Sequence, residues 1–238
     1  MLAFSPTGNR EINKWSGKLS SGLSFRSGNV KQTDINISVT VQRRTPATQL
    51  TLSYLGSYSV VNDAQTENDQ RADLTFDYYL SRRLFVRAAD FDYYRDPITN
   101  IQRRITLGSG VGYDLFNIPH FEWEVTAGPA WQSNRFDSVE AGQSDMQESA
   151  ALVLGTRLDV ELTRRLDFII EYRGQFTGQK NDNTSQHFVS TLEFEIHKRL
   201  TLDLSFIWDR VNNPATSADG TTPATDDAQL IMSLGVDF

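Results

Sequence analysis

The sequence predicts a single all-β domain that folds as a 12-stranded antiparallel up-and-down transmembrane β-barrel, with short periplasmic turns and longer extracellular loops. Three observations carry this prediction. Segments of about ten to fourteen residues alternate apolar and polar side chains along almost the whole chain, as strands with two unlike faces do. The breaks between these segments are alternately short and long, which is typical of a barrel whose two ends differ. The last segment ends on the aromatic residue Phe238.

Composition excludes several other classes of protein. The 238 residues contain no cysteine, carry a formal net charge of -7 and have a mean hydropathy of -0.42. No run of about 18 apolar residues is present, so we expect no transmembrane helix. A barrel needs none, because only every second residue of a strand faces lipid. The negative charge argues against a nucleic-acid partner. No spacing typical of a metal site, a phosphate loop or a nucleophile motif occurs, so we predict neither a metal nor a cofactor.

The first four predicted strands have apolar residues at alternate positions. They cover residues 14–26, 31–44, 49–61 and 69–80. Their apolar faces are Trp15, Leu19, Leu23 and Phe25; Ile35, Ile37, Val39 and Val41; Leu50, Leu52, Tyr54 and Tyr58; and Ala72, Leu74, Phe76 and Tyr78. We expect these faces to contact lipid and the polar faces to line the interior of the barrel.

The fifth segment, residues 84–94, can be interpreted in two ways. We favour lipid contact for one face, which consists of Phe85, Arg87, Ala89, Phe91 and Tyr93. The other face holds Asp90 and Asp92, and two carboxylates in hydrocarbon would be less favourable than one arginine near an interface. A β-bulge within the segment is the alternative.

The remaining seven segments cover residues 103–115, 121–136, 149–162, 166–176, 186–196, 200–210 and 228–238. Their alternation is again that of strands with one lipid face. The segment 149–162 has the clearest pattern, with Leu152 and Leu154 set against Val153 and Gly155. In the segment 103–115, the glycines at 108, 110 and 112 share one face, which indicates a strand packed closely against bulky interior side chains.

The breaks between the segments form two sets. The short, basic breaks are 43–48, 81–83, 116–120, 163–165 and 197–199, and the longer ones are 62–68, 96–102, 137–148, 177–185 and 211–227. An even number of strands places both chain ends on the short-turn side, which is periplasmic in outer-membrane barrels. We therefore predict a barrel over residues 14–238, preceded by a flexible segment, residues 1–13.

The start of the chain leaves one alternative open. Residues 1–6 have no apolar core of the length that a secretory signal needs. Because an outer-membrane protein must be exported, we expect its signal to have been removed. The alternative is a cytoplasmic protein whose barrel or sandwich turns its apolar face inward.

Aromatic residues near both ends of the strands favour the membrane, where such residues form two girdles. The predicted lipid-interface residues are Trp15, Trp123, Phe168, Phe194 and Phe238 at the short-turn end, and Phe25, Trp131 and Trp208 at the long-loop end.

Several short motifs occur in a characteristic order along nearly the whole chain. They are KWSG at 14–17, SGN at 27–29, RRTP at 43–46, YLSRR at 79–83, YRDP at 94–97, GVGY at 110–113, AGPA at 127–130 and GVDF at 235–238. In this order the chain resembles the YdiY-like "salt-induced outer membrane protein" family of Gram-negative bacteria. The resemblance implies a barrel in the cell envelope, in contact with membrane lipid and lipopolysaccharide. It also implies recognition of the C-terminal strand, ending in Phe238, by the barrel-assembly machinery. The family has no settled biochemical activity, so no catalytic residue is carried over.

The candidate site consists of the charged residues on the predicted interior face. These pore-lining candidates are Arg71, Asp73, Asp77, Arg104, Glu122, Glu124, Arg157, Asp159, Glu161, Glu171, Arg173, His187, Glu193, Glu195, Asp203 and Asp209. Counting through the turn 163–165 places Arg157 opposite Glu171, where opposite charges attract. Two interpretations remain open. The charges can line a narrow, cation-preferring pore, or they can form an ion-pair network that fills a closed barrel.

The leading functional prediction is therefore passive. We expect a porin-like narrow channel, or an envelope-stabilising barrel with little flux, and no enzymatic activity. One alternative is a surface hydrolase centred on His187 and Asp209, which counting through the turn 197–199 places opposite each other, with Arg173 on the preceding strand. A histidine beside a carboxylate can act as a general base, although no nucleophile can be placed next to it. A receptor or adhesin that uses the acidic outer loops is the other alternative.

Overall fold

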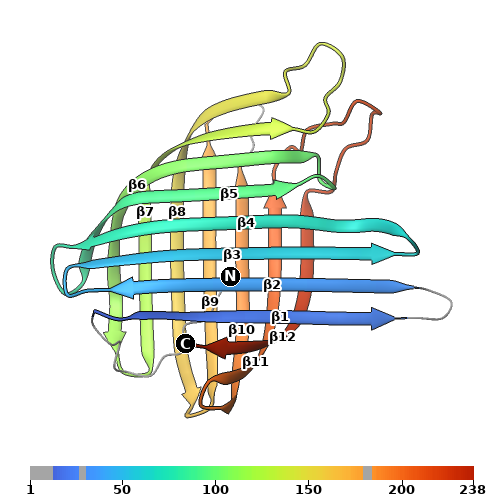
Figure 1. Ribbon diagram of the computed structural model, residues 1–238. Coiled ribbons are helices and arrows are strands. Elements are labelled where there is room, and N and C mark those ends of the chain that lie inside the picture. The colour runs from blue at the N-terminus through green and yellow to red at the C-terminus, as the bar shows by residue number, and fades with distance from the viewer. Residues whose placement is uncertain (1–12, 27–30, 179–183) are drawn as a thin grey trace.

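The computed structural model describes residues 13–26, 31–178 and 184–238, and of Phe25 and Arg26 it describes the backbone only. Apart from Asn13, the predicted segment 1–13 lies outside the described residues. Within them, twelve antiparallel strands form one closed barrel, in which each strand pairs with its neighbours along the chain and β1 pairs with β12 (Figure 1). The strands are β1 Trp15–Arg26, β2 Gln32–Arg44, β3 Thr48–Val61, β4 Ala64–Tyr79, β5 Leu84–Asp96, β6 Ile101–Ile118, β7 Phe121–Phe136, β8 Met146–Thr163, β9 Leu166–Thr177, β10 Ser185–His197, β11 Leu200–Val211 and β12 Asp226–Asp237. The predicted fold class is confirmed.

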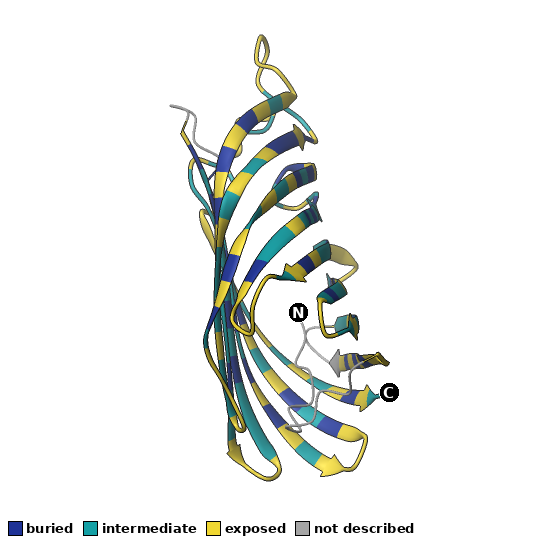
Figure 2. Cartoon of the chain, turned by 90° about the vertical axis from the view of Figure 1, so that its left-hand side faces the viewer, coloured by how far each residue is buried: buried dark blue, intermediate teal, exposed yellow. Residues whose placement is uncertain are grey.

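The two sides of the barrel cross each other. Figure 1 shows β1 to β5 running across the view, with β9 to β11 running steeply behind them. Figure 2 shows buried and exposed residues alternating along the strands, as a closed sheet with one inward face requires. In β10, for example, Val189 and Glu193 are buried whereas Leu192 and Phe194 are exposed. None of the described residues belongs to a helix that is long and apolar enough to cross a membrane.

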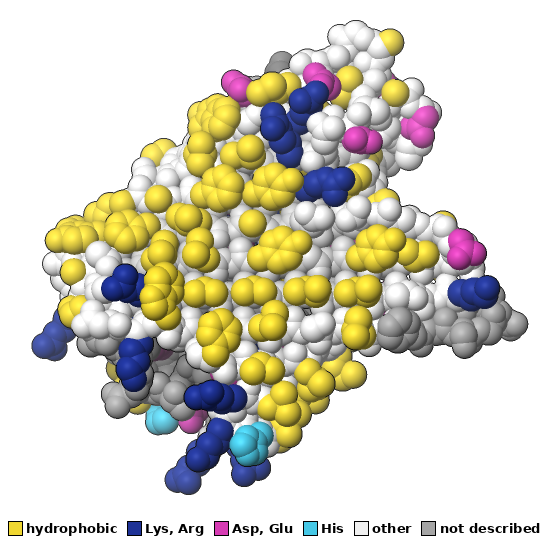
Figure 3. Space-filling model, in the orientation of Figure 1, with side chains coloured by type: hydrophobic (Ala, Val, Ile, Leu, Met, Phe, Trp, Pro, Cys, Tyr) yellow, Lys and Arg dark blue, Asp and Glu magenta, His cyan; other side chains and the backbone are white. Residues whose placement is uncertain are grey.

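The outer face of the barrel is apolar. Figure 3 shows hydrophobic side chains covering much of one outer face. Leu19, Leu52 and Tyr54, which the alternation assigned to lipid, are all exposed there, as are Leu230 and Met232 of β12. Removing such side chains from water is worth about 25 cal/mol per Å² of apolar area. An exposed apolar surface of this extent indicates contact with an apolar environment.

The predicted long break at residues 62–68 is wrong. β3 and β4 are joined by a two-residue turn, Asn62 and Asp63, whose φ angles are 49° and 64°. Two consecutive positive φ values define the tight hairpin turns that match the twist of antiparallel strands, and Asn and Asp tolerate them best. The polar residues after this turn extend β4 beyond the apolar part of the strand, which is why alternation alone missed them.

The favoured assignment for the fifth segment is also corrected in part. An extra residue at Ala88 shifts the register of β5 against both β4 and β6, so that Arg87 and Asp90 both face the interior. Phe85 is fully buried inside the barrel instead of contacting lipid, whereas Phe91 and Tyr93 keep the outward face. The bulge that the sequence left as an alternative is therefore present.

Gly112 makes room for this inward phenylalanine. A Cβ at position 112 would lie 2.1 Å from Cζ of Phe85. The interpretation of the glycines in β6 as close neighbours of a bulky interior side chain is correct at this position.

Candidate functional site

The predicted pore-lining residues all occupy buried or half-buried positions. The buried ones are Arg71, Asp77, Arg104, Asp159, Glu171, His187, Glu193 and Asp203, and the half-buried ones are Asp73, Glu122, Glu124, Arg157, Glu161, Arg173, Glu195 and Asp209. Their placement on the inward face follows from the period of two along each strand. Their partners fall into two classes, which differ in whether the ion pair joins neighbouring strands or opposite walls.

Arg71 joins opposite walls near the long-loop end. Its Nη2 on β4 donates a hydrogen bond to Oδ1 of Asp209 on β11 at 3.1 Å, although these strands are not neighbours. The same oxygen lies 2.8 Å from Nδ1 of His187 on β10. Nη1 of Arg71 is also 4.0 Å from Asp92 on β5. One arginine therefore links three carboxylate or imidazole groups across the interior.

A second set of contacts crosses from β9 to β5 and β6. Nη2 of Arg173 forms an ion pair with Asp90 at 2.9 Å. Gln175 donates to Oδ1 of Asp92 at 2.9 Å and accepts a hydrogen bond from Thr106 at 2.9 Å. These side chains connect walls that backbone pairing does not connect.

Lys18 forms buried ion pairs across β12 near the short-turn end. Its Nζ on β1 lies 2.7 Å from Glu193 on β10 and 2.8 Å from Asp203 on β11. To reach them it crosses β12 at Gly235, where an added Cβ would lie 2.4 Å from Cε of Lys18. A glycine is needed there because the lysine stem fills the space of a side chain.

The ion pairs of Arg157 and Arg87 run between strands that are close together in the sheet. Arg157 contacts Glu171 at 2.7 Å and Asp159 at 3.0 Å, so the predicted pairing across the turn 163–165 is confirmed. Arg87 contacts Asp77 on the adjacent strand at 2.8 Å and Glu124 on β7 at 3.5 Å.

The predicted pair of His187 and Asp209 is also confirmed, as is the position of Arg173 opposite His187. The imidazole is 6% exposed, and among the described residues its Nε2 has no hydrogen-bond partner. A general base needs a reacting group within hydrogen-bond reach of this nitrogen. No hydroxyl or carboxyl group of the described chain is bonded to it, and Asp209 is shared with Arg71.

The interior is filled where these charges meet. A side chain that lines an open aqueous pore remains exposed to water, but Lys18 and Asp92 are each 1% exposed and Arg104 is 2% exposed. Between the Arg71 and Lys18 contacts, Leu55 of β3 packs against Val189 and Ile207 of β10 and β11. An apolar contact therefore separates the two charged levels of the interior.

The predicted interface aromatics lie mostly on the outside. Trp15, Trp123, Trp131, Phe194 and Phe238 are exposed, whereas Phe168 and Trp208 are half-buried. The side chain of Phe25 lies outside the described residues. Trp123 stacks on Phe116 with ring centroids 6.2 Å apart, and its indole nitrogen donates to Thr156. This is the amphipathic arrangement that aromatic residues adopt at membrane interfaces.

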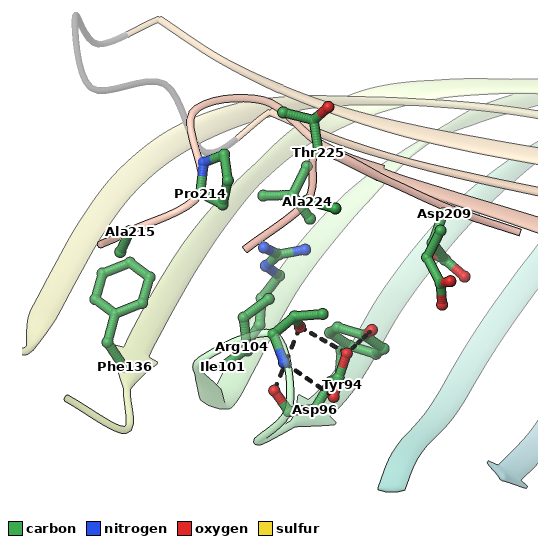
Figure 4. Close-up of a pocket in the computed structure, with 13 residues that line it drawn as sticks. Tyr94, Asp96, Ile101, Arg104, Phe136, Asp209, Pro214, Ala215, Ala224 and Thr225 are labelled. Atoms are coloured by element: carbon green, nitrogen blue, oxygen red, sulfur yellow. Dashed lines mark hydrogen bonds between the residues drawn. The ribbon is translucent and has the colours of Figure 1, made fainter. Parts of the chain in front are cut away.

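The β11–β12 connection, residues 212–225, is held over the long-loop end by Asn100. The Asn100 Nδ2 donates to the backbone oxygens of Ser138 at 2.9 Å and Ala215 at 3.1 Å. Its Oδ1 accepts from the backbone nitrogen of Ser138 at 2.9 Å. Figure 4 shows Pro214, Ala215, Ala224 and Thr225 of this connection among the residues that line a cavity at this end. Sequence reasoning missed Asn100, whose only signal is that Asn is common in turns.

The sequence of nearly the whole barrel matches a known protein family. A family model described as a protein of unknown function, DUF481, matches residues 19–238. The chain belongs to the DUF481 family. This membership is consistent with the resemblance to YdiY-like proteins, and it agrees with the expectation of a family without an assigned activity. No curated protein matches the chain in sequence.

Solved structures share the fold at low sequence identity. One is the NanC porin, with a TM-score of 0.51 and 11% identity, where the match covers 93% of this chain and 98% of that one. Another is the COG4313 outer membrane channel from Pseudomonas putida F1, with a TM-score of 0.50 and 12% identity, covering 99% of this chain and 100% of that one. At such identities the likeness shows the fold alone.

Proposed function

We propose that this DUF481 protein is a bacterial outer-membrane barrel that acts as a narrow passive channel, closed at rest by ion pairs between opposite walls. The observation that carries the proposal is the ion pair from Arg71 on β4 to Asp209 on β11, which crosses a charged interior. A barrel that served only to stiffen the envelope would need no such charges, because apolar packing fills an interior without desolvating ions. Mixed charges can instead rearrange and hydrate when a solute enters.

Location and orientation follow from the same proposal. The apolar outer face would contact membrane lipid, and lipopolysaccharide would surround the longer loops. The backbone of Phe238 pairs with Gly17 of β1, so both described ends of the barrel lie on the short-turn side, which would be periplasmic. The barrel-assembly machinery would engage the strand that ends in Phe238.

The test is the conductance of the refolded protein in a planar lipid bilayer. We expect rare, small openings for the wild type, and a several-fold increase in open probability or step size for Arg71→Ala, because this substitution removes the link between β4 and β11. Arg157→Ala is the matched control, since it removes an arginine of the same interior face whose ion pairs with Asp159 and Glu171 lie within one hairpin. Folding of each variant is confirmed by heat-dependent gel mobility.

Two results would contradict the proposal. Large, steady steps for the wild type that Arg71→Ala leaves unchanged would mean that the ion pairs do not close the pore. Complete silence of folded wild type and Arg71→Ala would mean a permanently filled barrel. The hydrolase alternative has the His187–Asp209 pair in its favour, but the imidazole is buried among interior side chains, so the channel is the function that the geometry supports better.

A further inference from the structure

The cavity beneath the β11–β12 connection has apolar walls and a cationic group beside them. Its walls include Ile101, Phe136, Val211, Pro214 and Ala224. Small-molecule sites are mostly apolar with a few polar groups that orient the ligand, and the exposed lining of this cavity is mostly apolar. Figure 4 shows the guanidinium of Arg104 pointing toward Ala224 and Thr225 of the covering connection.

Arg104 is a buried cation without a carboxylate partner. It is 2% exposed, and its Nε donates to Asn134 at 2.7 Å. Its Nη2 has no hydrogen-bond partner, and no carboxylate of the described chain forms an ion pair with it. The Nδ2 of Asn134 is also buried without a partner. Its Cζ lies 5.7 Å from the ring centroid of Tyr94, so the guanidinium has an aromatic face beside it but no counter-ion. A buried charge without a counter-ion is unfavourable, so an anion that paired with it would gain affinity.

The carboxylates that line the same cavity already have partners. Asp209 accepts hydrogen bonds from Arg71 and His187. Asp96 accepts from Thr99 at 2.6 Å and from Tyr94 at 3.3 Å. A third lining carboxylate, Asp227, accepts from Gln229 at 3.4 Å. Among the described residues, none of these three carboxylates forms an ion pair with Arg104.

We propose that this cavity binds a small amphipathic anion, whose carboxylate pairs with the guanidinium of Arg104 while its apolar body lies between Ile101, Phe136 and Pro214. A planar guanidinium binds carboxylates in two-point geometry, which gives orientation as well as affinity. The proposal deepens the proposed function, on which it rests for its biological meaning, because it names the class of solute that the channel would admit. Asn100 would hold the cover of the site through Ala215.

The experiment measures binding of benzoate to the folded full-length protein in detergent micelles by isothermal titration calorimetry. Benzamide, benzylamine and inorganic phosphate are the comparison probes. We expect benzoate to bind at least about tenfold more tightly than each of the three, because only benzoate combines a carboxylate with an apolar ring. Equal or tighter binding of benzamide or benzylamine would overturn the anionic part of the proposal. Equal binding of phosphate would overturn the amphipathic part.

Arg104→Gln should weaken benzoate binding at least about tenfold, because it removes the charge and the two-point donor. Arg103→Gln is the matched control, since Arg103 is the exposed neighbour of Arg104 and should bind benzoate like the wild type. Unchanged binding to folded Arg104→Gln would contradict the proposal. If Arg104→Gln does not fold, Ala224→Phe provides the test, because it fills the cavity from the covering connection and leaves the residues of the strands unchanged. Ala224→Phe should abolish binding, and retained binding would place benzoate elsewhere.

The thermal stability of Arg104→Met distinguishes a structural role of Arg104 from a role in ligand binding. If Arg104 only supports Asn134, Arg104→Met should lower the thermal stability of the barrel. If it is held for a ligand, Arg104→Met should leave the stability unchanged or raise it, since it removes a buried unpaired charge, while benzoate binding is lost. Binding is measured without flux, so retained binding with a silent bilayer would refute only the channel, and conductance without binding would refute only this site.

Discussion

The ion pairs of Arg71 and Arg157 use the same side chain on the same interior face, yet they do different things. Arg71 on β4 pairs with Asp209 on β11 and so holds two opposite walls together. Arg157 pairs with Glu171 and Asp159 on its own hairpin and so reinforces a contact that backbone hydrogen bonds already make. The number of interior charges therefore says little about closure of a barrel. Closure depends on which strands the charges connect.

The largest loss of stability is expected for Lys18→Met. It would leave Glu193 and Asp203 buried without their cation, which typically costs about 3–5 kcal/mol of folding free energy. Urea unfolding in lipid vesicles measures it, with Lys14→Met, at an exposed position, as the control. A loss below about 1 kcal/mol, the value of an exposed ion pair, would show that the contact across β12 does not hold the barrel together.

The next effect is the coupling between Arg71 and Asp209. A double-mutant cycle with Arg71→Ala and Asp209→Ala should give an interaction free energy of about 1–3 kcal/mol, because the residues are in direct contact. The cycle for Arg71 with Glu171 serves as the reference and should be additive. Additivity of the Arg71 and Asp209 substitutions would break the distinction between wall-joining and hairpin pairs.

A smaller effect is expected for Arg157→Ala. The side chain of Arg157 is 25% exposed, compared with 1% for Lys18, so water can enter the space that Arg157→Ala leaves and hydrate Glu171 and Asp159. We expect a loss of about 1–2 kcal/mol and unchanged bilayer conductance. A change in conductance as large as that of Arg71→Ala would remove the contrast between the two arginines.

The smallest effect is expected for Thr106→Val, which removes one neutral hydrogen bond to Gln175 across the interior. Such a bond contributes about 0.5–1.5 kcal/mol. Chemical denaturation measures this loss. Thr126→Val, at an interior position of the neighbouring strand β7, is the control. A loss well above this range would mean that Thr106 supports more of the cross-barrel network than its single contact indicates.

The sequence could predict neighbours within the sheet but not partners across the interior. Counting through a tight turn places Arg157 opposite Glu171 and His187 opposite Asp209, because register in a hairpin follows from the turn. The contact of Lys18 with Glu193, by contrast, depends on how the closed barrel is tilted and how far its walls are apart. No local pattern encodes these quantities, so the pairing of Arg71 with Asp209 could not be derived.

The same limit explains the errors along the strands. A single extra residue at Ala88 exchanges the inward and outward faces of β5 before the bulge relative to those after it. The pair Ala88 and Ala89 gives no sequence signal for a bulge. The polar start of β4 after Asn62 and Asp63 has no apolar alternation, although its backbone pairs with β3 as far as the turn, with one bulge at Thr66. Gln175 and Asn100 were missed because uncharged polar residues are common on any interior face or turn.

The contact of Lys18 over Gly235 also has a consequence for the order in which the barrel forms. The backbone pairs between β1 and β12, Lys18 to Asp237 through Ser21 to Leu234, join residues from opposite ends of the chain. Contacts of such large sequence separation are the slowest to form, so ring closure comes after the hairpins. Interactions that are made only after the rate-limiting step affect the unfolding rate most. The ion pairs of Lys18 should therefore slow unfolding of the closed barrel and have little effect on its folding rate.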